Sequence, residues 1–443
     1  MKKRVFAIVL TLATVLALTT NAALSDDEVT EQVAAVSVER EEAPAAAEEQ
    51  AAVAEEQEEV VVAPDAEGTL SFANLAGRMK ENYYPLLALK ESIDDVESHD
   101  YEWRYQNLRN RLNDIADLQW QMISGATMPG NPLGPMIGSM TAQGYQSTYD
   151  AYREQFDDVK DGTTQKDDED ALWKYHNGEN LTIIGGESLY IQIKSYQAQD
   201  EAITRGLAKL DRSIRELELR QELGQVSAVT VEQVKATRAQ TASQQQTLRT
   251  GIDALLLNLK SMVGVELGDS LTLGALPKVT EAQLAAMDLE ADMEKAKEAS
   301  YNLHDVEKKI DDFRKGTYDD VIDKLGENEK IFEVSQVKST LRILQINYED
   351  AKQTFELNFR TLYAQVKDAA QVLEAKKAAL VSQEKSYAVS ALKYVQGSIS
   401  ANALADAKDD LASAKDDVAT AERDLFSKYH TYQWAVEYGI LNS

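Results

Sequence analysis

Residues 335–395 carry the longest regular pattern in this sequence of 443 residues. Apolar side chains recur there mostly at alternating spacings of four and three, with one shift in phase: Val337, Leu341, Leu344, Tyr348, Ala351, Phe355, Phe359, Leu362, Val366, Ala369 and Leu373. Such a stripe is typical of helices that pack against other helices. An unbroken helix over this range would be about 90 Å long. That length excludes a core helix of a compact globule and predicts a coiled coil or a helical tube.

A second helix follows after a very short connection, residues 397–401. The stripe resumes with a spacing of three and four from Leu404 to Leu425, and alanine fills alternate positions. Gly397 suits the left-handed end of the first helix, and Ser400 suits the N-cap of the second. The sequence therefore predicts an antiparallel helical hairpin with a tight tip.

The same tip pattern occurs earlier in the chain. Glycine, serine, alanine and lysine fall at the same offsets after Gly224 as after Gly397. We expect a helix from about Glu187 to Leu223, a cap at Ser227 or Thr230, and a return helix that stops near Gly264. Residues 181–193 could instead form a β-hairpin, but we favour a helix that starts at Gly186.

These matches predict a duplicated unit. Four positions near the start of each unit also correspond: Tyr84, Leu86, Leu89 and Ile93 with Tyr301, Leu303, Val306 and Ile310. We expect a first repeat over residues 69–267 and a second over 268–443. The first repeat carries an insertion around 122–186, which includes the Met/Gly/Pro stretch 128–136 and an acidic loop.

The first 68 residues are predicted to lie outside the helical repeats. Residues 1–22 resemble a signal peptide, with a basic start, an apolar run and small residues before cleavage after Ala22; an uncleaved membrane anchor is the alternative. Residues 23–68 are acidic, with 15 acidic residues and one basic residue from Asp26 to Glu67. Such a segment cannot bury enough apolar surface to fold, so we expect a disordered linker.

Composition excludes several classes of function. The net charge of −29 argues against nucleic acid as a partner, and the absence of cysteine excludes disulfides and thiolate chemistry. No nucleophile motif or phosphate-binding glycine loop occurs, so we expect no enzyme, no catalytic residue and no cofactor.

Metal sites are not expected either. Four histidines, His99, His176, His304 and His430, are scattered along the chain. Residues 157–168 resemble a calcium loop, but Val159 stands where an oxygen ligand belongs. A solvated acidic loop is the favoured interpretation.

The repeated unit resembles the TolC-like outer membrane efflux proteins over about residues 69–443. The resemblance rests on the opening stretch from Leu70 through Asn82-Tyr-Tyr-Pro85-Leu, and on the tip Glu222-Leu-Gly-Gln-Val-Ser. It also rests on the repeat endings at Gly264 and, more loosely, Gly439. It implies an all-α fold in the main, a tandem repeat of long antiparallel helical hairpins in a TolC-like tube. Little or no β-barrel is visible in this sequence, because residues 308–321 are charged and lack alternation.

By this resemblance, three chains would form a helical tube whose tips bind a periplasmic-type adaptor or pump component. We carry partner binding over to six tip residues only: Gly224, Val226, Ser227, Gly397, Ile399 and Ser400. Asp406, Asp409 and Asp410 follow the second tip. They could face a bore, but an ordinary outer face is the favoured interpretation.

The predicted function is a subunit of an efflux or export duct in the cell envelope, with membrane association as a further expectation. The alternative is an exported coiled-coil scaffold or adaptor that lost the membrane barrel. The expected location is the outer membrane if a barrel exists, and otherwise extracellular or periplasmic. Alternating strands in residues 122–190 and 311–335 would favour the duct. Helix throughout would favour the scaffold, or a duct completed by another protein.

Overall fold

The computed structural model describes residues 65–66, 68–126 and 133–441, all within one compact unit, residues 61–443. The predicted signal peptide (1–22) and most of the predicted linker (23–68) lie outside the described residues and stay predictions. The same holds for residues 127–132 of the Met/Gly/Pro stretch.

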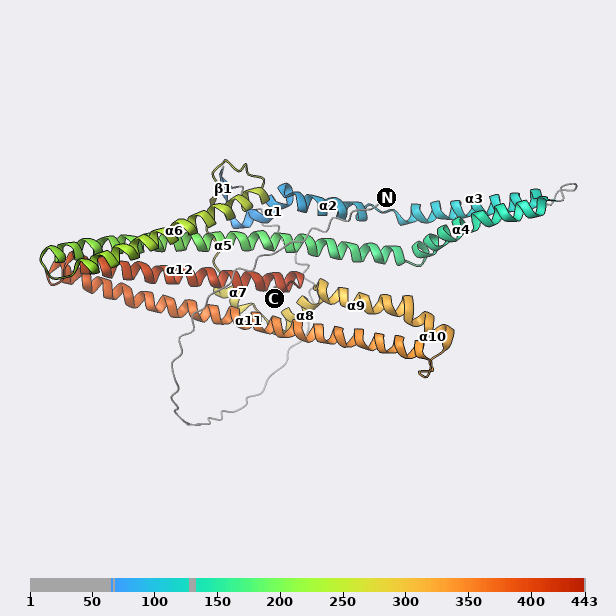
Figure 1. The fold of residues 1–443 in the computed structure, drawn as a ribbon. Coiled ribbons are helices and arrows are strands. Elements are labelled where there is room, and N and C mark those ends of the chain that lie inside the picture. Colours follow the sequence, from blue (N-terminus) through green and yellow to red (C-terminus); the bar gives the residue numbers. More distant parts are fainter. Residues whose placement is uncertain (1–64, 67, 127–132, 442–443) are drawn as a thin grey trace, which may run out of the picture. The chain divides into compact units, whose positions relative to one another are not determined.

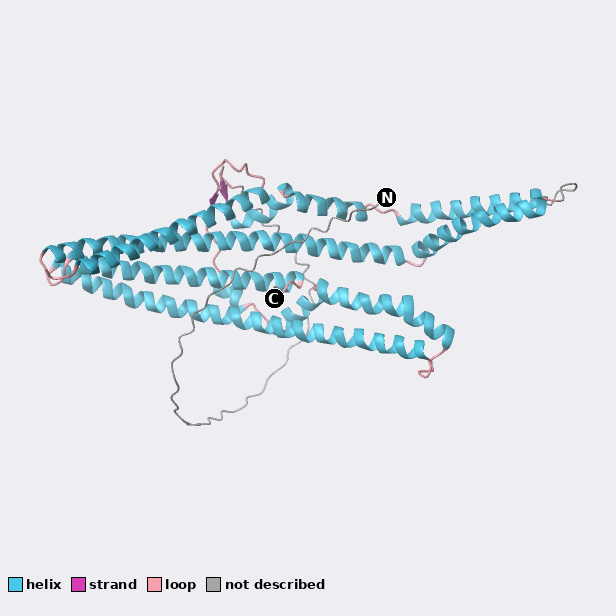
Figure 2. Cartoon of the chain, in the orientation of Figure 1, coloured by secondary structure: helices cyan, strands magenta, loops and turns pink. Residues whose placement is uncertain are grey.

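Helices dominate the described residues, which confirms the prediction of a mainly α fold (Figure 2). The shorter helices are α1 (Phe72–Asn82), α2 (Tyr84–Glu97), α7 (Glu281–Ala285), α8 (Leu289–Glu298), α9 (Tyr301–Phe313), the π-helix η1 (Arg314–Tyr318) and α10 (Asp319–Leu325). The longer ones are α3 (Tyr101–Ala126), α4 (Gly134–Lys160), α5 (Thr163–Glu222), α6 (Ala228–Met262), α11 (Phe332–Val395) and α12 (Ala401–Tyr438). Within the described ranges, no helix combines the length and the apolar character needed to cross a bilayer.

Two long hairpins, α5–α6 and α11–α12, form the main frame (Figure 1). Helix α11 covers the whole heptad stripe and has 64 residues, so the prediction of one unbroken helix is confirmed. Phe355, Phe359 and Val366 of the stripe are buried against α12 and α8.

Helix α5 corrects the predicted start of the first hairpin. It begins at Thr163 and runs through Gly186 without a break, so neither a helix start at Gly186 nor a β-hairpin over 181–193 forms. The glycine serves close packing instead. A Cβ on Gly186 would lie 2.4 Å from Sδ of Met79 in α1. The sequence shows the glycine, but it does not show that Met79 packs against this position.

The first half contains a third hairpin, α3–α4, which begins at Tyr101, before the predicted insertion around 122–186, while residues 163–186 belong to α5. Its two helices pack mainly on each other, and Tyr105 stacks on Phe156 with ring centroids 4.8 Å apart. In the second half, only η1, α10 and the turn after Leu325 stand between α9 and α11. The described residues of 122–190 and 311–335 are therefore almost entirely helical.

One short strand pair joins the two predicted repeats. Strand β1 (Thr69–Leu70) lies parallel to β2 (Thr272–Leu273), with Leu70 opposite Leu273. The hydroxyl of Tyr190 in α5 lies 2.9 Å from the carbonyl oxygen of Leu70 and 3.0 Å from that of Gly274. Burial raises the pKa of Tyr190 to about 12. The neutral hydroxyl of Tyr190 thus holds both strands against α5.

Buried apolar side chains form two clusters. One contains α1, α5 and α6 residues such as Met79, Ile193 and Leu259, and the other contains residues of α8, α11 and α12. Helix α12 contributes to both, because Phe426 and Trp434 belong to the first. The boundaries of the two predicted repeats are not tested by this arrangement and stay predictions.

The two adjacent glycines of α5 provide a direct test of packing. We expect Gly186→Ala to destabilise the chain by about 1–3 kcal/mol, because the added methyl group overpacks the contact with Met79. Gly185→Ala is the control: nothing lies within 4 Å of its Cβ position. It should stabilise the helix by about 0.5–1 kcal/mol. Thermal unfolding by circular dichroism measures both, and equal effects would contradict the packing argument.

Candidate functional site

The first hairpin tip is a left-handed glycine turn followed by a serine cap. Gly224 has φ +70°. Its amide donates to Gln221 O at 2.9 Å, while Gln225 N donates to Arg220 O at 2.8 Å, the two bonds of a Schellman motif. The hydroxyl of Ser227 then accepts from Thr230 N and starts α6. Of the two caps predicted, Ser227 is the one used.

The second tip repeats this geometry. Gly397 has φ +73°. Its amide donates to Tyr394 O at 2.9 Å, and Ser398 N donates to Lys393 O at 2.8 Å. Ser400 caps α12 by accepting from Ala403 N at 3.1 Å. Val226 and Ile399 are half-buried at matching positions of the two turns.

Polar contacts between the hairpins bring the two tips to the same end of the frame. Helices α5 and α12 run antiparallel, and Arg205 pairs with Asp416, Arg212 with Asp409. Closer to the tips, Asn402 Nδ2 donates to a carboxylate oxygen of Glu216 at 3.0 Å. The structure therefore places the six predicted residues close together in two neighbouring turns.

Two of the aspartates after the second tip contact the other hairpin. Arg212 of α5 pairs with Asp409 and lies 3.7 Å from a carboxylate oxygen of Asp406, which is exposed. The expectation of an ordinary outer face, with a bore as the alternative, stays a prediction. Asp410 is exposed.

Sequence reasoning missed an apolar rim around the tips. Leu223 is 64% exposed, Val229 66%, Leu392 63% and Val395 84%. Together with the six predicted residues, these four side chains make up what we call the tip surface. Their exposure could have been predicted from their position beside the turns, because an apolar side chain there has no partner helix to pack against.

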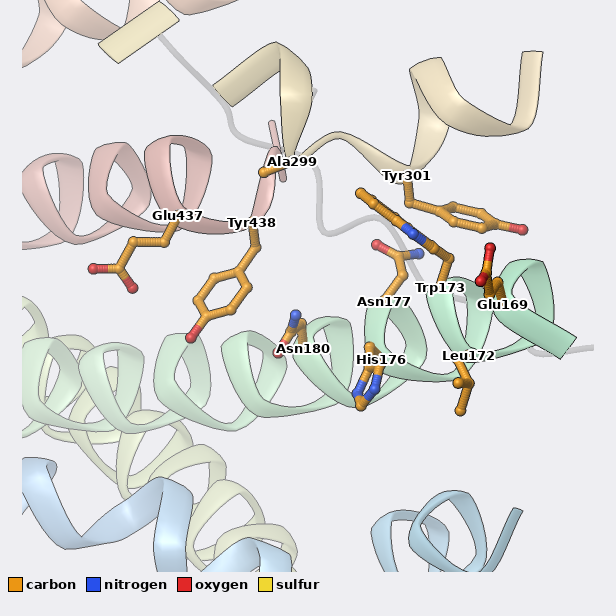
Figure 3. Close-up of a pocket in the computed structure, with 10 residues that line it drawn as sticks. All are labelled: Glu169, Leu172, Trp173, His176, Asn177, Asn180, Ala299, Tyr301, Glu437 and Tyr438. Carbon is orange, nitrogen blue, oxygen red and sulfur yellow. The ribbon is translucent and has the colours of Figure 1, made fainter. Parts of the chain in front are cut away.

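A separate cavity of about 460 Å³ lies between α5, the start of α9 and the end of α12 (Figure 3). Trp173, Tyr301 and Tyr438 supply aromatic walls, and Asn177 and Asn180 supply amides. The volume falls in the range of small-molecule sites, and rings of this kind can hold an organic cation. The cavity lies about 75 Å along α5 from the tip surface.

Carboxylates shape the electrostatics of this cavity. Burial raises the pKa of Tyr438, and the charges of Glu437, Glu179 and Glu187 raise it further. Glu187 is itself buried at the α5–α12 contact. It accepts from Trp434 Nε1 at 2.8 Å and lies 2.8 Å from Nε2 of His430.

A polar cluster fixes the aromatic wall. The indole of Trp173 stacks on His304 with centroids 4.8 Å apart, and His304 Nε2 lies 2.8 Å from Asp170. Burial opposes ionisation of Asp170, but hydrogen bonds from Lys308 and His304 outweigh it and lower its pKa. Asp170 thus joins α5 to α9.

Each of the four histidines lies near a carboxylate: His99 by Asp168, His176 by Glu179, His304 by Asp170 and His430 by Glu187. Only the pair of His176 and Glu179, three residues apart on α5, is local in sequence. Residues 157–168, which resemble a calcium loop in sequence, form the end of α4 and the start of α5. Asp168 there accepts from Tyr101 OH at 3.0 Å. In the residues that the structure covers, no group of three or more ligand side chains could hold a metal ion.

Comparisons with known proteins find similarity in structure only. No family model and no curated protein matches the chain. The outer membrane channel CmeC of Campylobacter jejuni is similar with a TM-score of 0.44 and 12% identity, over 84% of this chain and 86% of that one. The outer membrane protein VceC of Vibrio cholerae is similar with a TM-score of 0.39 and 12% identity, over 62% of this chain and 76% of that one. CusC is similar with a TM-score of 0.42 and 13% identity, over 82% of this chain and 99% of that one. We therefore argue function from the geometry of this chain.

The two serine caps should matter equally. Ser227→Ala and Ser400→Ala each remove the acceptor of a first-turn amide, so each should cost about 1 kcal/mol of stability. Ser398→Ala, in the second turn but not at its cap, should stay within about 0.5 kcal/mol of the parent. Chemical denaturation of the three variants measures this, and a loss at Ser398 as large as at the caps would contradict it.

Asp170 should make stability depend on pH. Its folded pKa lies below the ordinary 3.8, so its contribution is present above that value and is lost as pH falls through the folded pKa. Asp170→Asn should cost about 1–3 kcal/mol at pH 7, and the difference from the parent should shrink below about pH 4. Asp167→Asn is the control, because that carboxylate is 69% exposed and 3.8 Å from Lys308. A difference that is constant from pH 7 to pH 3 would contradict the assignment.

Proposed function

We propose that this chain is a subunit of an exported helical duct, in which several copies join their long hairpins side by side. The observation that carries this is a second apolar stripe on α11. Ile343, Ile346, Leu357 and Val372 are 53%, 58%, 65% and 43% exposed. Their spacings are close to whole numbers of helical turns, so they share one face.

That face lies roughly opposite the buried one. Phe355, Phe359 and Val366 point to the core of the second half. A helix with apolar residues on two opposite faces is normally covered on both. Other helices of the same chain cover one face of α11. Neighbouring copies would cover the other face, as in the wall of a tube. A homotrimer is the assembly that the resemblance to TolC-like efflux proteins implies.

The tip surface is then the end at which such a tube meets its partner. Six predicted residues and four exposed apolar side chains gather there in two turns of the same geometry. An adaptor or pump component with an apolar helical end would suit this surface. This placement supports transport across the cell envelope as the role.

A scaffold is the second candidate. Its support is the helix over 134–160, 163–190 and 314–325, which by the sequence argument favours a scaffold or a duct completed by another protein. Both candidates share export and coiled-coil contacts. They differ in whether the copies enclose a bore.

The mass of the mature chain in solution tests the duct. Light scattering should give three times the chain mass, and Leu357→Glu should lower it to that of one chain, because a carboxylate enters an apolar contact between copies. Leu267→Glu is the control: this leucine is 60% exposed but lies in the loop after α6.

A stable monomer both with and without detergent would contradict the duct proposal and favour the scaffold. If the trimer is found, electron microscopy of its end view decides between them. A central opening supports the duct, and a solid bundle supports the scaffold.

A further inference from the structure

The cavity between α5, the start of α9 and the end of α12 has no role in the proposed duct (Figure 3). All ten residues that line it are described, and all belong to one chain. Its volume of about 460 Å³ is large enough for a small organic molecule. The side chains of its walls indicate which class of molecule it fits.

One face of α5 forms the long side of the cavity. Four lining residues follow one another there at spacings of four, four and three: Glu169, Trp173, Asn177 and Asn180. Residues at these spacings share one side of a helix. From Glu169 to Asn180 the helix rises about 17 Å. The cavity is therefore elongated, with Glu169 at one end of this side and Asn180 at the other.

Two aromatic rings lie at the Glu169 end. Trp173 is one turn from Glu169 along α5, and Tyr301 reaches the same end from the start of α9 (Figure 3). The indole of Trp173 stacks on His304 and is still 37% exposed. A carboxylate beside two rings suits a cation, because the negative ring faces and the carboxylate attract the same charge.

Tyr438 lies at the opposite end. Tyr438 and Asn180 also line a neighbouring hollow, whose lining does not include Trp173 or Tyr301. The ring of Tyr438 packs on Trp434 with centroids 4.7 Å apart and is 39% exposed. This end therefore offers apolar surface to the body of a ligand.

The charges around the cavity favour a cation over an anion. Among its ten lining residues the charged ones are two carboxylates, Glu169 and Glu437, and His176 is the imidazole. Burial raises the pKa of Tyr438, and the charges of three carboxylates raise it further: Glu437, Glu179 and Glu187. The potential is thus negative at the Tyr438 end as well.

Nearby basic side chains have carboxylate partners of their own. Lys308 of α9 pairs with Asp170, and Lys80 of α1 lies 3.0 Å from Glu179. The Nδ1 atom of His176 lies 3.7 Å from Glu179. None of these three contacts involves Glu169, so a bound cation would meet that carboxylate directly.

We propose that this cavity binds an organic cation with an apolar body. The positive group lies beside Glu169, against Trp173 and Tyr301, and the body extends along α5 toward Tyr438. Two of the rings are held in place before a ligand enters, Trp173 by His304 and Tyr438 by Trp434, so binding costs little side-chain entropy. The site lies within one chain and does not rest on the proposed duct.

Binding of benzyltrimethylammonium to the full mature chain tests the proposal. Benzyl alcohol and phenylacetate are the neutral and anionic counterparts, and saturation-transfer NMR titrations measure all three. The cation should bind with a Kd of about 1 mM or lower, as expected for so small a molecule. Benzyl alcohol should bind about fivefold more weakly, and phenylacetate more weakly still. Absence of saturable binding of the cation, or equal affinity for all three, would overturn the proposal.

Three variants locate the binding site. Glu169→Gln keeps the shape of the side chain and removes its charge, so it should weaken binding of the cation about threefold to fivefold and leave benzyl alcohol unchanged. Tyr301→Leu removes a ring but keeps apolar volume, and about a threefold loss for the cation is expected. Glu307→Gln is the matched control, because it removes the same charge from an exposed position of α9 outside the lining. Equal losses in Glu169→Gln and Glu307→Gln would assign binding to the net charge of the protein and contradict the site.

A basic side chain of another copy is the competing occupant. If benzyltrimethylammonium lowers the light-scattering mass of the protein, a lysine or arginine of a neighbouring copy fills the cavity, and the proposal is wrong. An unchanged mass together with the cation preference supports a site for a small molecule.

Discussion

Packing of α11 along α12 is the interaction on which the rest of the structure depends. Most of the stability of a helix in a protein comes from the packing of one face rather than from helix propensity. Phe355, Val366 and Leu373 of α11 are buried in the cluster that Leu425 of α12 completes. The tight turn at Gly397 keeps this register, because it leaves no slack between the two helices.

Contact between the two hairpins depends on charge as well as on apolar burial. Arg212 with Asp409 and Arg205 with Asp416 join α5 to α12 at intervals of about two turns. Each pair is partly exposed, so each contributes little by itself. Their common effect is register, because a shift of one turn would move one helix about 5.4 Å along the other and change both pairings.

The chain exposes apolar surface at two places along its long hairpins, and each suits a different neighbour. The stripe on α11 is long and lies on one face, which fits the same stripe on further copies. The tip surface is small and lies on two turns, which fits the end of a partner. The acidic excess elsewhere keeps such a chain dispersed in water.

Local sequence determined much of this protein. The stripe over 335–395 predicted α11, and the paired signals at Gly224 with Ser227 and Gly397 with Ser400 predicted both turns, because periodicity, glycine and serine caps act within a few residues. Tertiary structure alone decided what depends on distant neighbours. Gly186 stands inside a helix because Met79 packs on it, and Asp409 pairs with Arg212 of the other hairpin. Helices α3 and α4 form a hairpin because they pack mainly on each other. Such pairings join residues far apart in the chain, and no local pattern records them.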